Sequence, residues 1–123
     1  MAMRKGDLLY MKNVEEIVEQ TLLYDFYSEL LTASQRKIYE EVFFDDLSLS
    51  EVAKEENITR QGVYDMIKRT QKALINYEKK LGLVDRYKKQ KDIVSEIERS
   101  VKKIKDSDAK KTLTELLKEL KSI

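Results

Sequence analysis

The sequence contains no cysteine, proline, histidine or tryptophan, and it has only three glycines in 123 residues. Without cysteine, the chain cannot form a disulfide bond, a thiol nucleophile or a thiolate metal site. Without histidine it lacks the commonest general base and metal ligand, so we expect no enzymatic activity, no metal and no cofactor. The scarcity of glycine and proline leaves little of the turn chemistry that β-hairpins need, which favours an all-α fold.

Long hydrophobic runs are also missing. No apolar stretch approaches the roughly 20 residues of a membrane span, and the opening residues lack the apolar core of a signal peptide. We therefore expect a cytoplasmic protein with no membrane insertion. Charged residues make up 38% and hydrophobic residues 41% of the chain, which is typical of a soluble helical protein. A chain of this length can bury one modest core, so we expect one domain with an extension.

The net charge of +1 conceals an uneven distribution of charge. Residues 1–57 hold six basic and 13 acidic side chains, whereas residues 58–91 hold ten basic and three acidic ones. A basic segment beside an acidic scaffold is typical of polyanion binding. The alternative is that the two segments attract each other within the fold.

The stretch LSLSEVAKEENITRQGVYDMI, residues 47–67, has the spacing of a helix-turn-helix. Ala53 is small enough for two helices to cross closely, and Asn57 tolerates the left-handed conformation that reverses the chain. Thr59 can cap the second helix with its hydroxyl. The apolar interior shared by the two helices is expected to contain Val52, Ala53, Ile58, Val63, Met66 and Ile67. Any two short amphipathic helices could produce a similar string, which is the simpler alternative.

The second helix of this motif carries polar and basic residues on its outward face. Side chains near the start of such a recognition helix contact base edges in the DNA major groove, and later basic residues hold phosphates. Asp65 is a difficulty, because phosphates repel a carboxylate unless it accepts a hydrogen bond from a cytosine amine. The candidate nucleic-acid-binding residues are Arg60, Gln61, Tyr64, Asp65, Lys68, Arg69 and Lys72.

Three segments are expected along the chain: a flexible tail over residues 1–12, a helix-turn-helix domain over 13–83, and a helical hairpin over 84–123. Capping boxes of Thr32 with Gln35 and of Ser48 with Glu51 predict two helix starts. The motif's second helix is expected from about Arg60 to Leu81, with Leu81 facing inward, and Gly82 then fits a left-handed stop.

The C-terminal segment predicts a helix over Asp85–Lys105 and a last helix capped by Ser107 or Asp108. The apolar stripes of these two helices fit an antiparallel hairpin, a self-association surface, or both. We expect a homodimer.

The run LLTASQRKIYEEVFFDDLSLSEVAKEENITRQGVYDMIKRTQKAL resembles the YlxM family of small bacterial proteins, whose helix-turn-helix is similar to region 4 of the RNA polymerase sigma factors. The similarity extends from about Tyr24 to Leu83. The family usually has an apolar or aromatic residue followed by glycine where this chain has Glu56 and Asn57, and more often alanine at Gly62.

This resemblance implies a sigma region 4-like bundle without a wing. It also implies a non-enzymatic regulatory or accessory role in the signal recognition particle pathway. The partners implied are DNA, the particle's RNA and its GTPases. The alternative is a sequence-specific DNA-binding transcriptional regulator with no direct part in protein targeting.

Overall fold

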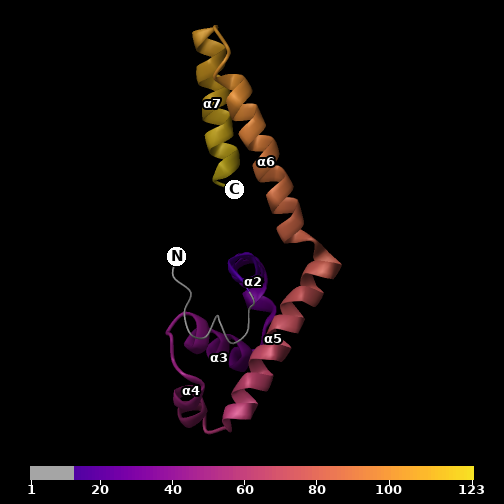
Figure 1. Cartoon of the computed structure of the whole chain (residues 1–123). Coiled ribbons are helices and arrows are strands. Elements are labelled where there is room, and N and C mark those ends of the chain that lie inside the picture. The colour runs from indigo at the N-terminus through magenta and orange to yellow at the C-terminus, as the bar shows by residue number, and fades with distance from the viewer. Residues whose placement is uncertain (1–12) are drawn as a thin grey trace. The chain divides into compact units, whose positions relative to one another are not determined.

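The computed structural model describes residues 13–123, so the tail expected over 1–12 lies outside the described part. The described residues form helices and no strand, which confirms the all-α fold (Figure 1). The elements are α2 (Val14–Tyr27), the short 3-10 helix η1 (Ser28–Leu30), α3 (Ala33–Phe43), α4 (Leu49–Glu56), α5 (Arg60–Leu81), α6 (Leu83–Val101) and α7 (Ser107–Lys121).

Local capping chemistry determines where these helices begin. The Thr32 hydroxyl accepts from the Gln35 amide at 3.2 Å while the Gln35 side chain accepts from the Thr32 amide at 3.0 Å, and Ser48 with Glu51 repeats this arrangement. Both predicted capping boxes are thus confirmed. The predicted cap of the last helix was wrong, because the carboxylate of Asp106 accepts from two backbone amides and α7 begins at Ser107.

The helix-turn-helix consists of α4, a short turn and α5. Asn57 adopts the expected left-handed conformation, with φ of 56°, and the Ile58 amide donates to the Ala53 carbonyl at 3.0 Å. The Thr59 hydroxyl accepts from the Gly62 amide at 2.9 Å, as predicted for the cap of α5. One expectation was wrong: Ile58 is 40% exposed, because the turn carries its side chain to the rim of the motif.

A single apolar core holds the motif against α2 and α3. It is built at helical spacing on each helix, since residues three or four apart share a face. Its most buried members are Leu23, Tyr27, Ile38, Tyr39, Val42, Phe43, Val52, Val63, Ile67 and Leu74. The predicted interior residues Val52, Ala53, Val63 and Ile67 are buried, and Met66 is partly buried.

The end of α5 is fixed by Gly82, which adopts the left-handed conformation with φ of 64°. The Tyr27 hydroxyl donates to Glu78 Oε1 at 2.6 Å and accepts from the Leu83 amide at 3.0 Å. Glu78 Oε1 also accepts from the Val84 amide at 3.0 Å. The backbone amides of Leu83 and Val84, which follow the end of α5, therefore have hydrogen-bond partners. Leu81 was expected to face inward but is exposed, because α5 extends past its buried contacts at this point.

The chain divides into two compact units, one ending at Val84 and the other covering Asp85–Ile123. In the second unit α7 runs back along α6 as an antiparallel hairpin (Figure 1). The Lys121 ammonium pairs with the Glu98 carboxylate across the hairpin, and Val101 and Leu117 are buried between the helices. No helix within residues 13–123 is long and apolar enough to cross a membrane.

Candidate nucleic-acid interface

The start of α5 is held from one side by the core. Val63, Ile67 and Thr70 are fully buried, and the Thr70 hydroxyl donates to the Met66 carbonyl at 2.8 Å. Because these positions recur every three or four residues, they form one face of α5 that packs on the core. The sequence pattern placed the apolar members of this buried face, but nothing in it indicated that Thr70 would be buried.

The seven candidate residues divide into two groups by exposure. Tyr64 and Lys68 are half-buried, and Tyr64 packs on the edge of the apolar core. The exposed candidates are Arg60, Gln61, Asp65, Arg69 and Lys72. The structure thus brings all seven to one helix, with its basic side chains outward or at the boundary of the core.

Two contacts within α5 link four of these candidates. The Gln61 side-chain amide donates to Asp65 Oδ1 at 2.9 Å, and the Lys68 ammonium lies 5.6 Å from the centre of the Tyr64 ring. The first contact gives the Asp65 carboxylate a donor before any nucleic acid approaches. The second holds a cation over an aromatic face, which restricts the Lys68 side chain.

The first turn of α5 is unusually tight around Gly62. A Cβ added to Gly62 would lie 3.1 Å from the Thr59 hydroxyl oxygen, the atom that caps the helix. A glycine here leaves room for the cap. The contact with the Thr59 hydroxyl therefore gives a physical reason why this chain has Gly62 where the resembling family more often has alanine.

Beside the motif, α3 and α4 are joined by a charged cluster that the sequence did not reveal. The Lys37 ammonium lies 2.9 Å from Glu56 Oε1, and this contact lowers the pKa of Glu56. Glu41 is buried, and burial with the hydrogen-bonded Glu56 carboxylate raises the pKa of Glu41 to about 7. Glu56, which stands where the resembling family usually has an apolar or aromatic residue, therefore has a cation and a neighbouring carboxyl group as partners.

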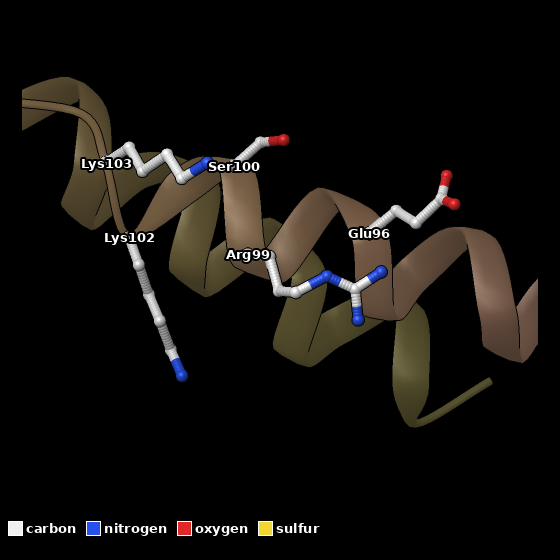
Figure 2. Close-up of a pocket in the computed structure, with 5 residues that line it drawn as sticks. All are labelled: Glu96, Arg99, Ser100, Lys102 and Lys103. Carbon is white, nitrogen blue, oxygen red and sulfur yellow. The ribbon is translucent and has the colours of Figure 1, made fainter.

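No group of three or more acidic residues within 13–123 is arranged to hold a metal ion. The hairpin bears a depression of about 550 Å³ lined by Glu96, Arg99, Ser100, Lys102 and Lys103 (Figure 2). Figure 2 shows the Lys102 side chain extending away from the helix, whereas the Arg99 side chain runs toward the turn that carries Glu96. Four of the five residues that line the depression are charged: Glu96, Arg99, Lys102 and Lys103.

Comparison with known proteins identifies the same motif. Residues 14–116 match the model of the YlxM/p13-like helix-turn-helix family, UPF0122. A family protein from Listeria welshimeri is 40% identical over 104 residues, covering 83% of this chain and 94% of its own. One from Thermoanaerobacter sp. is 36% identical over 106 residues, covering 86% and 91%. One from Halalkalibacterium halodurans is 38% identical over 104 residues, covering 85% and 95%. This chain is therefore a member of the YlxM/p13-like family of helix-turn-helix proteins.

Proposed function

We propose that this protein is a non-enzymatic regulatory protein that binds duplex DNA through the outward face of α5. The proposal is supported chiefly by the way buried apolar residues alternate with polar and basic residues along α5. Val63 and Ile67 face the core, while the seven polar and basic candidates lie on the other faces or at the core's boundary. A rigid helix with this division can present its side chains to a groove without unfolding its support.

The candidates divide by the contacts that each could make. Arg60 and Gln61 are close to the start of α5, where side chains approach base edges, and Arg69 and Lys72 follow where phosphates lie. The hydrogen bond from Gln61 supports this assignment, because it satisfies part of the Asp65 carboxylate. Asp65 then acts by orienting Gln61.

Salt dependence tests this proposal. Binding to genomic duplex fragments is measured by fluorescence anisotropy at several salt concentrations, for the native chain and for Arg69→Ala with Lys72→Ala. We expect the slope of log affinity against log salt to become shallower by roughly 2, since each lost phosphate contact removes about 0.9. The matched control is Lys111→Ala on the hairpin. Absent or salt-insensitive binding by the native chain would remove the proposal.

A second candidate is an adaptor role in the signal recognition particle pathway, which the family resemblance implies. The same face would bind the particle's RNA or an acidic surface of its GTPase. The exposed cations Arg60, Arg69 and Lys72 favour this candidate, because they can contact phosphates or carboxylates without reading a base sequence. RNA duplexes have a major groove too narrow for a helix, so their recognition depends on backbone and shape.

A pull-down from cell lysate distinguishes the adaptor role from the first proposal. The tagged chain should retain the particle's RNA or its GTPase, and the Arg69→Ala, Lys72→Ala variant should retain less. The Lys111→Ala variant is again the control. If neither the RNA nor the GTPase is recovered with the native chain, the adaptor role is wrong, whatever the result with DNA.

A further inference from the structure

The hairpin of α6 and α7 buries few of its own apolar side chains. In this fully described unit, Val101 and Leu117 are the only buried residues. Ile93 is 56% exposed, Leu116 54% and Leu120 49%. Two helices in contact along one narrow seam therefore leave much of their apolar surface in water.

A unit of this size needs further support to remain folded. Segments below about 40 residues usually depend on disulfides, metals or oligomerisation. The chain has no cysteine, and no metal-ligand cluster occurs within residues 13–123. Of these three supports, oligomerisation is the one for which the hairpin has the chemistry.

Helical periodicity divides the hairpin into two sides. At 100° per residue, Ile93 and Ile97 of α6 lie on the same side as the exposed leucines of α7, and we call these five residues the apolar face: Ile93, Ile97, Leu113, Leu116 and Leu120. The other side holds a groove of about 280 Å³ lined by charged residues around the seam: Glu98, Lys102, Lys110, Lys118 and Lys121, with Val101, Thr114 and Leu117. The apolar face is thus separate from the charged groove.

We propose that the apolar face binds the same face of a second copy of this chain, so that two hairpins form an antiparallel four-helix bundle. A second copy supplies a stripe of matching length and composition, and a twofold axis makes such a contact self-complementary. In a four-helix bundle the exposed leucines and isoleucines become core positions. The bundle thereby provides the interior that one hairpin lacks.

Charge at the edges of the face selects one arrangement of the bundle. By the same periodicity, Glu96 flanks the face on α6, and Glu115 and Glu119 flank it on α7. Lys103 follows the end of α6, in a turn where its amide donates to the Ser100 carbonyl at 3.1 Å. Because Lys121 pairs with Glu98, Lys103 lies near the level of Glu115. A twofold axis parallel to the helices places α6 of one copy against α7 of the other, and Lys103 then approaches two carboxylates. The alternative twofold axis places α6 of one copy against α6 of the other. Lys103 then approaches neither of the two carboxylates.

The mass of the intact chain in solution, measured by sedimentation equilibrium over a wide concentration range, tests the bundle. The native chain should be a dimer. Leu116→Glu with Leu120→Glu should weaken association by roughly a hundredfold or more, because two carboxylates would be buried without partners. Both positions are half-exposed in one hairpin, so circular dichroism should show that helix content is retained. The matched control is Thr114→Glu beside the charged groove, which should remain a dimer.

Charge reversal tests which helices are adjacent. Lys103→Glu should weaken the dimer several-fold, and adding Glu115→Lys with Glu119→Lys should restore it, since opposite charges then face each other again. Additive losses would contradict the pairing of α6 with α7. A native chain that is monomeric at every concentration, or a dimer that survives Leu116→Glu with Leu120→Glu, would overturn the proposal.

Discussion

The hydroxyl of Tyr27 donates a hydrogen bond of 2.6 Å to Glu78, although the two residues are 51 positions apart. The same hydroxyl accepts from the Leu83 amide beyond the end of α5. One side chain on α2 therefore supports both the last turn of the long helix and the break that follows it. Burial and the bond to Glu78 raise the pKa of Tyr27.

Replacement of this tyrosine should be costly. Tyr27→Phe leaves Glu78 and the Leu83 amide without their shared partner, so we expect the free energy of unfolding to fall by about 2 kcal/mol. Urea titration measures this change. Tyr77→Phe is the matched control, because its hydroxyl donates only to the exposed Leu30 carbonyl, and it should cost less than about 1 kcal/mol. Equal costs would contradict the role of Tyr27.

Stability should depend on pH through Glu41. Its pKa is raised to about 7 in the folded chain, against about 4.3 when unfolded. Between these values the unfolded chain loses a proton that the folded chain keeps, so stability falls as pH rises from about 4 to 7. We expect a loss of roughly 1–3 kcal/mol over that window.

The cause is the position of Glu41 between α3 and α4. Its Oε2 atom is buried and receives no hydrogen bond from a donor among residues 13–123. When protonated, it can donate to the Glu56 carboxylate that Lys37 also contacts. Glu41→Gln should remove most of the pH-dependent loss, measured by thermal unfolding at several pH values. Glu29→Gln on the exposed η1 should keep the native profile, and an unchanged profile in Glu41→Gln would count against this explanation.

Glycine at position 57 should stabilise the turn of the motif. Asn57 has φ of 56°, a region where asparagine is tolerated and glycine is unstrained. Asn57→Gly should raise the free energy of unfolding by about 0.5–1 kcal/mol, and Asn57→Val should lower it by at least about 1 kcal/mol. Chemical denaturation of both variants measures the difference. If valine is tolerated as well as glycine, the turn does not require this conformation.

Gly62 and Thr59 should show coupled effects on stability. Alanine in a helix interior is ordinarily better than glycine by about 0.5–1 kcal/mol, but a Cβ at Gly62 would crowd the Thr59 hydroxyl. Gly62→Ala should therefore give little gain in the native chain and the full gain when Thr59→Ala is also present. A double-mutant cycle measures this coupling. Additive effects would show that the cap does not restrict residue 62.

Features set by local chemistry could be predicted from the sequence. The capping boxes, the left-handed Asn57 and the Gly82 stop each depend on residues a few positions apart, and all three are present in the structure. Features that join distant segments could not be predicted. Helical spacing placed Leu81 on the inward side, but in the fold its side chain is 54% exposed.

The candidate interface could likewise be predicted from the sequence only in part. The outward positions on α5 followed from periodicity. The half-burial of Tyr64 did not, because it depends on how closely the core approaches that helix. The cluster of Lys37, Glu41 and Glu56 joins two helices through side chains that the sequence pattern did not bring together.

Mapping by NMR tests most directly whether α5 is the binding surface. The isotopically labelled chain is titrated with genomic duplex DNA, and the backbone amide shifts are followed residue by residue. We expect the largest changes over residues 60–72, with smaller changes at the end of α4 and none of comparable size on α7. Changes confined to the hairpin, or no changes at a DNA concentration that saturates other helix-turn-helix proteins, would contradict the assignment of α5.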